Sequence, residues 1–128
     1  MRLEVKCNTV LIVDDDEDIR DVVKMSLELE GYDTITASHG LDGLERLRHM
    51  AEQPCLVLLD LMMPVMDGWE FVRNIERDHV LSDIPIAVVS AFSEKAATLK
   101  GKVFLKKPID LESLLQLVKR YCHAEKSE

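Results

Sequence analysis

The sequence predicts an α/β protein in which a parallel β-sheet is covered by helices on both faces. Its short apolar runs, such as residues 9–13 and 56–59, are continuous rather than alternating, which is typical of strands buried on both faces. Each run is followed by a segment with apolar residues at helical spacing. Five strands alternate with five helices, a pattern that favours right-handed crossovers and a parallel sheet. Periodicity alone leaves the strand order open.

In the first half of the chain, acidic residues and a glycine mark the ends of the elements. Asp16 is expected to cap the first helix, and Gly31 is expected to end it. The second strand is less apolar and is expected near an edge of the sheet. The expected elements are a strand over residues 9–13, a helix up to Gly31, a strand over 32–37, and a helix marked by Leu41, Leu44, Leu47 and Ala51 and ended by Pro54.

In the second half, Asp67 and Glu70 form an Asp-x-x-Glu box that starts the third helix, and Asp110 caps the last one. A short fourth helix is expected before Gly101. The expected strands cover residues 56–60, 85–90 and 102–106, the short helix covers 94–100, and the apolar face of the last helix comprises Leu111, Leu114, Leu115, Val118 and Cys122.

Length and charge limit the class of protein. A chain of 128 residues fits a single domain over residues 1–128, with a core over about 9–122 and short polar tails. The formal net charge of −8 argues against direct nucleic-acid binding or a membrane surface. There is no long apolar run and no leader pattern, so a cytoplasmic protein is expected. Cys7, Cys55 and Cys122 lack metal-ligand or Cys-x-x-Cys spacing and are expected to be reduced, mostly buried thiols.

Polar residues follow four of the expected strands. Asp14 and Asp15 end the first strand, Asp60 ends the third, Ser90 ends the fourth, and Lys107 follows the fifth. In open α/β sheets, ligands bind beyond the carboxyl ends of the strands. Taken singly, the aspartates are also common helix caps, Ser90 a loop start and Lys107 a solvated charge. Their joint occurrence favours a shared cleft.

Three carboxylates in one cleft repel one another and need a cation. Oxygen ligands favour a hard metal ion, Mg²⁺ or Mn²⁺. Lys107 and Ser90 are suited to bind phosphate oxygens. A carboxylate nucleophile beside a divalent cation and a lysine indicates phosphoryl transfer to an aspartate, which yields an acyl phosphate.

Four ordered motifs closely resemble the receiver domain of two-component response regulators, the chemotaxis regulators among them. The resemblance extends from about residue 9 to residue 121. The motifs are Val-Leu-Ile-Val-Asp-Asp-Asp at residues 10–16, Leu-Leu-Asp-Leu-Met-Met-Pro-Val-Met-Asp-Gly at 58–68, Val-Val-Ser-Ala at 88–91 and Lys-Lys-Pro at 106–108.

The resemblance implies a flavodoxin-like fold with strand order 2-1-3-4-5. It implies that Asp60 is the phosphoacceptor and that Asp14 and Asp15 hold Mg²⁺ with it. Met62 matches the position whose backbone carbonyl also binds the metal. Lys107 matches the lysine that contacts the phosphoryl group.

The resemblance also assigns a conformational switch. Ser90 matches the hydroxyl that turns toward the phosphoryl group, and Phe104 matches the aromatic residue that turns inward on activation. The bond preceding Pro108 is expected to be cis. Met62 and Phe92 occupy positions where polar residues in relatives align a hydrolytic water, so their apolar side chains predict slow loss of phosphate.

The sequence departs from the family pattern between Ser90 and Lys107, where the chain is short. The fourth helix is therefore expected to be truncated, with Lys95, Lys100 and Lys102 adding positive charge nearby. This places the output surface that many receivers use in doubt.

The expected function is a phosphorylation switch rather than an enzyme. A sensor histidine kinase or phosphotransfer protein would be the donor, and a downstream protein would read the state by contact or by onward phosphorelay. Both a monomer and a phosphorylation-dependent dimer are compatible with this reading. Two alternatives stay open: a pseudo-receiver that only binds a partner, and a haloacid-dehalogenase-like phosphatase with Asp14 as nucleophile.

Overall fold

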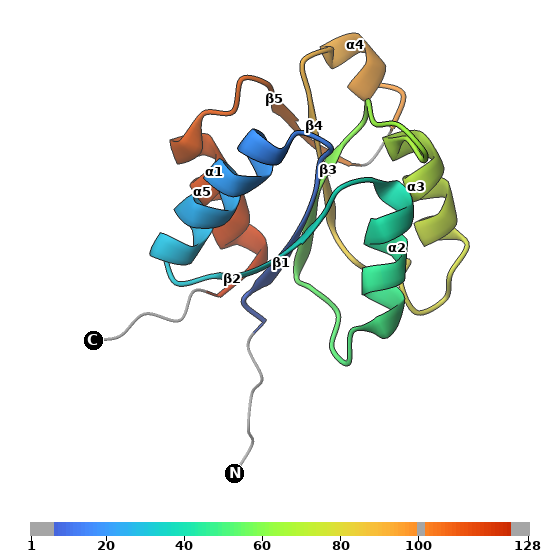
Figure 1. Cartoon of the computed structure of the whole chain (residues 1–128), viewed down its shortest axis with the longest axis horizontal. Helices are drawn as coiled ribbons and strands as arrows, with labels where there is room; N and C mark the ends of the chain where they lie inside the picture. Colours follow the sequence, from blue (N-terminus) through green and yellow to red (C-terminus); the bar gives the residue numbers. More distant parts are fainter. Residues whose placement is uncertain (1–6, 100–101, 124–128) are drawn as a thin grey trace.

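A parallel sheet of five strands forms the centre of the molecule, in the order β2-β1-β3-β4-β5 (Figure 1). The structure is a computed structural model that describes residues 7–99 and 102–123. The predicted α/β class and the strand order implied by the resemblance are confirmed. The strands are β1 (Thr9–Val13), β2 (Asp33–Ala37), β3 (Leu56–Asp60), β4 (Ile86–Ser90) and β5 (Val103–Lys106).

Helices cover both faces of the sheet. Figure 1 shows α1 and α5 on one face and α2 and α3 on the other. The helices are α1 (Glu17–Leu29), α2 (Gly40–His49), α3 (Gly68–Glu76), α4 (Ser93–Ala96) and α5 (Leu111–Tyr121). No helix in the described ranges is long and apolar enough to cross a membrane.

Alternating side chains of the central strands fill two separate apolar layers. Val57 and Leu59 of β3 join the cluster under α2 and α3, while Leu56 and Leu58 join the cluster under α1 and α5. This follows from the two-residue period of a strand. Every residue of β3 is buried, Asp60 included. The first four residues of β3 are therefore apolar, and the strand ends in a single polar residue, Asp60.

The predicted caps are confirmed. The side chain of Asp16 accepts hydrogen bonds from two backbone amides in the first turn of α1, while Asp67 and Asp110 each accept one backbone amide in the first turn of α3 and α5. Gly31 follows α1 with φ of 93°, a backbone conformation that suits glycine. An unexpected cap is His39, whose Nδ1 atom accepts the backbone amide of Asp42 at 3.2 Å.

Some predicted helix details differ from the structure. α2 ends at His49 because Met50 adopts an extended conformation, so Ala51 lies outside the helix and is exposed. On α5, Leu117 is buried whereas Leu111 in the first turn is 41% exposed. α4 is a single turn, as the predicted truncation requires. It ends at Ala96, so the expected helix over 94–100 is too long: residues 97–98 form a turn, and Lys100 and Gly101 lie outside the described residues.

The expectation of three reduced thiols is wrong for two of the cysteines. Cys55 and Cys122 are joined by a disulfide across 67 residues of chain, with Cα atoms 5.6 Å apart, while Cys7 is free. The start of β3 lies beside the end of α5 in the folded chain. Sequence spacing carries no information on that distance, which is why the pairing was missed.

The loop between β3 and α3 contains a tight turn. Val65 has φ of 69°, and the backbone amide of Met66 donates to the carbonyl of Pro64 at 2.7 Å, which closes a γ-turn. A β-branched residue at positive φ is unfavourable, because its Cβ crowds the backbone. The loop that follows Asp60 is therefore held in a strained conformation.

Replacing Val65 by asparagine should relieve this strain. We expect Val65→Asn to raise the free energy of unfolding by about 1 kcal/mol, because asparagine tolerates positive φ. Urea denaturation measures this change. Val80→Asn is the matched control, since Val80 is exposed to 69% against 73% for Val65 and is not among the described residues with positive φ. Equal effects of the two substitutions would contradict the strain.

Candidate functional site

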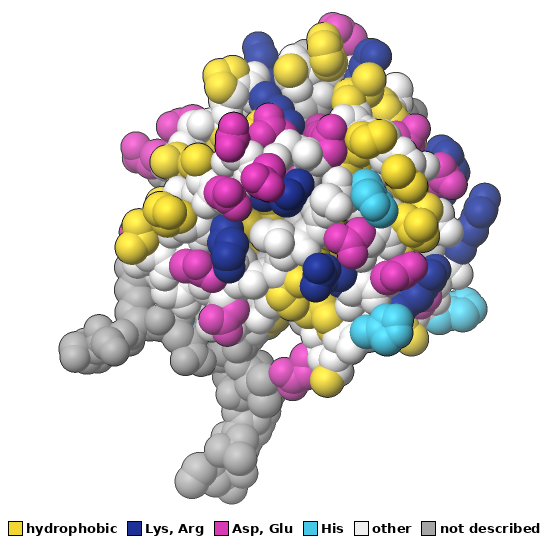
Figure 2. Space-filling view, viewed as in Figure 1, with side chains coloured by type: hydrophobic (Ala, Val, Ile, Leu, Met, Phe, Trp, Pro, Cys, Tyr) yellow, Lys and Arg dark blue, Asp and Glu magenta, His cyan; other side chains and the backbone are white. Residues whose placement is uncertain are grey.

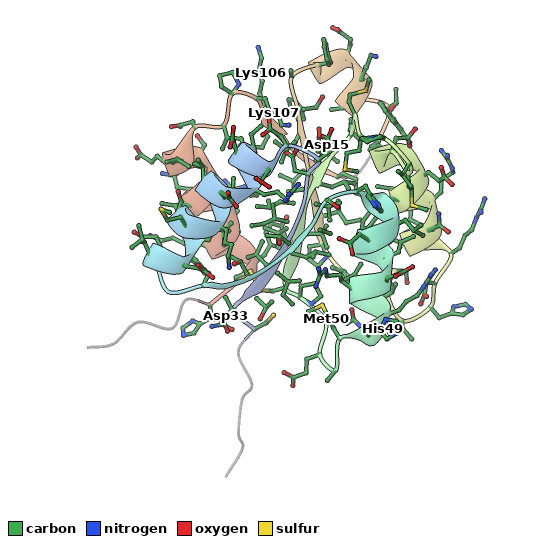
Figure 3. All side chains as sticks on the ribbon, viewed as in Figure 1. Asp15, Asp33, His49, Met50, Lys106 and Lys107 are labelled. Atoms are coloured by element: carbon green, nitrogen blue, oxygen red, sulfur yellow. A yellow bond between two sulfur atoms is a disulfide. The ribbon has the colours of Figure 1, made fainter. Side chains whose placement is uncertain are left out.

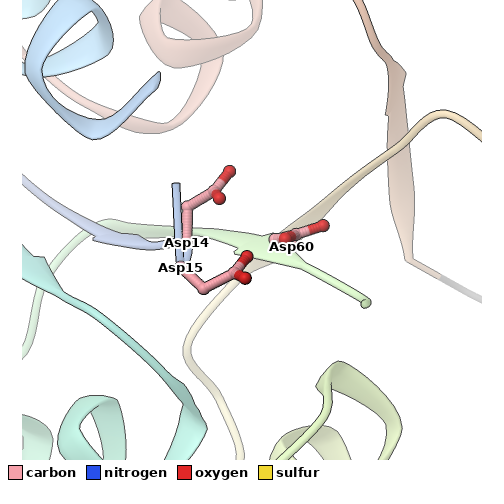
Figure 4. Close-up of side chains that lie close together, drawn as sticks. All are labelled: Asp14, Asp15 and Asp60. Atoms are coloured by element: carbon pink, nitrogen blue, oxygen red, sulfur yellow. The ribbon is translucent and has the colours of Figure 1, made fainter. Parts of the chain in front are cut away.

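Three carboxylates meet at the carboxyl end of the central strands (Figure 4). Asp14, Asp15 and Asp60 each offer an oxygen atom, and these atoms lie within 4.8 Å of one another. Asp14 and Asp60 are buried, with exposed fractions of 4% and 6%, while Asp15 is exposed. The cluster therefore has two buried charges and one side that opens to solvent.

The pairing of β1 with β3 brings these acids together. In the parallel register, Val13 lies opposite Leu59, so the next residue on each strand, Asp14 and Asp60, ends at the same edge of the sheet. The backbone amide of Asp14 still donates to the carbonyl of Ala37 in β2 at 3.1 Å. The two carboxylates are thus fixed by the sheet itself rather than by a mobile loop.

A lysine from the loop that follows the edge strand β5 contacts two of the acids. The Nζ atom of Lys107 lies 3.1 Å from Oδ2 of Asp14 and 3.5 Å from Oδ1 of Asp60. Its backbone amide donates to the carbonyl of Ser90 at 2.9 Å, and the peptide bond to Pro108 is cis. Figure 3 shows Lys107 and Asp15 near the same end of the sheet. Lys107 compensates part of the negative charge of the pair.

The surroundings raise the pKa of Asp60 to about 7, well above its ordinary value of 3.8. Burial is the largest cause, and the charge of Asp14 is the next; the attraction of Lys107 acts in the opposite direction. Burial by itself lowers the pKa of Lys107, but the two aspartates outweigh it and raise that pKa. The positive charge of Lys107 alone is therefore not enough to keep Asp60 fully ionised at neutral pH.

Several polar groups around Asp14 were not predicted from the sequence. The backbone amide of Asp16 donates to Oδ1 of Asp14 at 2.9 Å, and the guanidinium of Arg20 donates to the carbonyl oxygen of Asp14 at 2.7 Å. Arg20 lies one helical turn beyond the cap of α1, a spacing that could have indicated its return toward the acidic run. It fixes the backbone from which two of the acids project.

Gly68 supports the other side of the site. A Cβ atom at this position would lie 2.7 Å from Cα of Leu61 and 2.9 Å from the carbonyl oxygen of Asp60. The backbone amide of Gly68 donates to the carbonyl of Leu61 at 2.9 Å. The start of α3 can approach Asp60 this closely because Gly68 has no side chain. The Asp-Gly pair in the sequence was the available signal.

Ser90 and Phe104 lie on neighbouring strands but at different depths. Ser90 is 1% exposed, and its Oγ atom accepts the backbone amide of Phe92 at 3.0 Å. Phe104 lies opposite Val88 in the β4–β5 register and is 38% exposed. The serine hydroxyl thus faces the loop after β4, and the aromatic ring faces outward on the edge strand.

Met62 and Phe92 are exposed on the two loops that border the site. Each is 47% exposed, and the backbone amide of Met62 lies 3.4 Å from Oδ1 of Asp60, a long hydrogen bond. Phe92 follows Ser90 closely in the loop before α4. Both side chains are therefore accessible to solvent, on the loops that follow Asp60 and Ser90.

The donor set fits a hard divalent cation. It consists of carboxylate oxygens from three residues, with no sulfur or imidazole ligand among them. A dication in contact with Asp60 would also stabilise the ionised form that burial and Asp14 disfavour. The excess negative charge of the site is the feature of this structure that such an ion would balance.

Comparisons with known proteins agree with this geometry. The family model of the response regulator receiver domain matches residues 10–119. The chain belongs to this family. It carries the receiver domain of a two-component response regulator, a signalling domain, and this assignment replaces the phosphatase alternative.

Individual relatives give the same result. The DNA-binding dual master transcriptional regulator RpaA of a Synechocystis strain is 35% identical over 115 residues, which cover 86% of this chain and 47% of RpaA. This chain thus spans about half the length of that relative. A response regulator receiver protein from Pseudomonas putida matches with a TM-score of 0.83 and 28% identity, over 91% of this chain and 99% of that one. The Vibrio cholerae chemotaxis response regulator CheY4 has a TM-score of 0.81 and 31% identity, over 90% and 98%.

The raised pKa of Asp60 predicts a pH dependence of stability. A carboxyl group whose pKa is raised by folding stabilises the fold in its protonated form, so its contribution is complete below about pH 4 and is lost as the pH rises through about 7. Without divalent cations, the free energy of unfolding should fall by up to about 2 kcal/mol more in the wild type than in Asp60→Asn between roughly pH 5.5 and pH 8. Urea denaturation across this range tests the difference. Parallel profiles of the two proteins would show that Asp60 ionises as freely in the fold as in the unfolded chain.

Proposed function

We propose that Asp60 accepts a phosphoryl group with the help of Mg²⁺ and thereby switches the conformation of the domain. The observation that carries the proposal is the convergence of Asp14, Asp15, Asp60 and Lys107 at one edge of the sheet. A buried aspartate in contact with a lysine needs no divalent cation for folding alone. The additional acids, one of them exposed, are explained by a cation that is required for the chemistry.

The residues that would hold Mg²⁺, or Mn²⁺ in its place, are Asp14, Asp15 and Asp60, together with the backbone carbonyl of Met62. When bound, the ion supplies positive charge that neutralises the transferring phosphoryl group. Asp14 is oriented for this role by the amide of Asp16, and its backbone is held by Arg20. Asp15 lies on the exposed side, where a phosphodonor has access.

In the transfer step, a carboxylate oxygen of Asp60 attacks the phosphorus atom. The new bond between Asp60 and phosphorus forms as the bond to the donor nitrogen or oxygen breaks, and the electron pair leaves with the donor. Lys107 moves from its pairing with the free carboxylates to a phosphoryl oxygen, so its charge stays compensated. Ser90 donates its hydroxyl hydrogen to another phosphoryl oxygen.

The switch follows from the present position of Ser90. Its Oγ atom accepts the amide of Phe92, so turning toward a phosphoryl group at Asp60 releases the loop before α4. Phe104 lies on the next strand and is exposed in the present state, so its ring can move inward when that loop shifts. The phosphoryl group stabilises the rearranged state and shifts an existing equilibrium.

The surface next to the site suits a protein donor, a histidine kinase or a histidine phosphotransfer protein. Val22, Met25 and Leu29 form an exposed apolar row on α1, with exposed fractions of 54%, 65% and 79%. Figure 2 shows apolar side chains exposed over this part of the molecule. A groove of about 360 Å³ between the start of α1 and the β5–α5 loop includes Lys107. A helix that packs on this row would bring its histidine to the mouth of the site.

We also propose an extent, a compartment and a downstream partner for this domain. Residues 1–128 form a single receiver domain that acts in the cytoplasm, without direct contact to nucleic acid or membrane. A downstream protein reads the phosphorylated state by contact or accepts the phosphoryl group in turn. The short α4 is the feature of this chain that changes the usual output surface.

Phosphorylation from a small donor tests the proposal directly. After incubation with acetyl phosphate and Mg²⁺, the intact mass of the wild type should increase by one phosphoryl group. The increment should be absent without Mg²⁺ and in Asp60→Asn. An unmodified wild type would favour the pseudo-receiver, and an increment that persists in Asp60→Asn would assign the acceptor to another residue.

The lifetime of the acyl phosphate tests the role of the apolar residues at the mouth. We expect Met62→Asn to accelerate the loss of phosphate by about tenfold, because its amide can orient a water molecule toward Asp60; this is less than the roughly hundredfold or more that a general acid or base contributes, since an amide does not take up the proton. The decay of the phosphorylated mass after removal of the donor measures this rate. Val80→Asn, distant in sequence and equally conservative, should decay as the wild type does. Unchanged decay of Met62→Asn would remove Met62 from the account of phosphate lifetime.

A further inference from the structure

Three cysteines gather at the end of the sheet opposite Asp60. Cys7 precedes β1, Cys55 precedes β3, and Cys122 follows α5. All three belong to or pack against the apolar cluster between the sheet and the α1–α5 layer. Figure 1 shows that the end of α5 and the starts of these strands lie at the same end of the molecule. The phosphorylation site makes no use of these residues.

Cys55 and Cys122 form a disulfide in the structure. Their Cα atoms are 5.6 Å apart, in the middle of the range that disulfides require. Both residues are nearly buried, with exposed fractions of 9% and 8%. The bond joins the strand that carries Asp60 to the last helix of the described chain.

Cys7 lies beside both halves of this bond. Its carbonyl oxygen accepts the backbone amide of His123, the residue after Cys122, at 2.7 Å. Its Sγ atom lies 3.7 Å from the carbonyl oxygen of Gln53, two residues before Cys55. Cys7 is free and only half-buried, so it is more accessible to solvent than either partner of the disulfide.

We propose that these residues form a thiol–disulfide exchange site, in which Cys7 opens and closes the Cys55–Cys122 bond and so controls the covalent anchoring of α5. The thiolate of Cys7 attacks Sγ of Cys122; the Cys7–Cys122 bond forms as the Cys55–Cys122 bond breaks. The electron pair leaves with the sulfur of Cys55, which takes up the proton that Cys7 released. An external dithiol of the thioredoxin class then reduces the more exposed bond and becomes a disulfide itself.

The compartment favours a reversible bond over a permanent one. This step rests on the proposed function, because a receiver phosphorylated by an ATP-dependent kinase works where thiol reductants are present. Disulfides in such compartments are usually transient, with catalytic or sensing roles. A third cysteine adjacent to the bond supplies the attacking thiol that a buried, permanent disulfide does not need.

Opening the bond would act on α5 rather than on the acidic site. Apart from the disulfide, α5 is held to the sheet by apolar packing of Leu114, Leu117 and Val118. Its last residues lie at the end of the sheet farthest from Asp60. Reduction therefore removes the tie between α5 and β3 without touching Asp14, Asp60 or Lys107.

Counting free thiols is the first test. Wild type prepared without reductant and then alkylated under denaturing conditions should carry one label, on Cys7, and three labels after treatment with a dithiol. Peptide mapping should recover a linked Cys55–Cys122 pair. Three labelled cysteines in the unreduced sample, or a different internal pair, would overturn the site.

Substitutions separate the roles of the three cysteines. In Cys55→Ser, oxidation should produce a Cys7–Cys122 bond, because the two residues must be able to meet for exchange. In Cys7→Ser, reduction of the Cys55–Cys122 bond by the dithiol should be slower by tenfold or more. A Cys55→Ser protein that forms no internal bond, or a Cys7→Ser protein that is reduced at the wild-type rate, would remove Cys7 from the mechanism.

Thermal unfolding measures the anchoring of α5. Closure of a 67-residue loop should raise the Tm of the oxidised wild type by about 10 °C over the reduced form. Cys122→Ser should show no such shift, which controls for other effects of the reductant. Asp60→Asn should show the full shift, so this result does not depend on phosphorylation. Equal Tm values of oxidised and reduced wild type would show that the bond does not anchor α5.

Discussion

The electrostatic balance at the carboxyl edge of the sheet is the interaction on which the rest of this structure depends. Asp14 and Asp60 each offer a carboxylate oxygen within 4.8 Å of the other. Two unit charges at such a separation repel by roughly 3 to 4 kcal/mol at an effective dielectric constant of about 20. The Nζ atom of Lys107 contacts both Asp14 and Asp60 and offsets part of this repulsion. The compensation is incomplete: burial, and after it the charge of Asp14, raise the pKa of Asp60 although Lys107 acts in the opposite direction. The site is thus ready to accept further positive charge, which a divalent cation would supply.

The sheet provides the rigidity that such an arrangement requires. Asp14 and Asp60 extend adjacent strands that are buried and paired in register, so the backbones that carry the two carboxylates are held side by side. Lys107 is held through its backbone amide to the carbonyl of Ser90. Gly68 lets α3 approach the backbone of Asp60 from the other side. The free energy of apolar packing in two layers therefore maintains a charge arrangement that would separate in a flexible chain.

The two ends of the molecule have different chemistry. The carboxyl ends of the strands carry acids, a hydroxyl and an amine, and the opposite end carries three cysteines. The strand β3 runs between them, with Cys55 just before its first residue and Asp60 as its last. Loops at the acidic end include the strained turn at Val65 and the single turn of α4, whereas the opposite end is tied by a covalent bond. The covalent tie is thus at the end of the sheet opposite the acids.

The sequence by itself determined the fold class, the caps at Asp16, Asp67 and Asp110, and the positions of the polar residues at strand ends. These depend on local patterns: continuous apolar runs, helical spacing and side chains that bind the amides of the next turn. The strand order and the roles of individual site residues came from the resemblance to a family, because periodicity is the same for every strand order. The function that this resemblance implied, a receiver domain, agrees with the family and the solved structures.

Only the tertiary structure decided the distances between residues that are remote in the chain. It placed Lys107 between Asp14 and Asp60, brought Arg20 to the backbone of Asp14, and joined Cys55 to Cys122. It also buried Leu117 in place of Leu111 and ended α2 before Ala51, because packing against the sheet overrides a helical stripe read from sequence. The physical reason is common to all these cases. Local patterns fix the period of an element, whereas the burial and charge of a side chain depend on what the other elements place beside it.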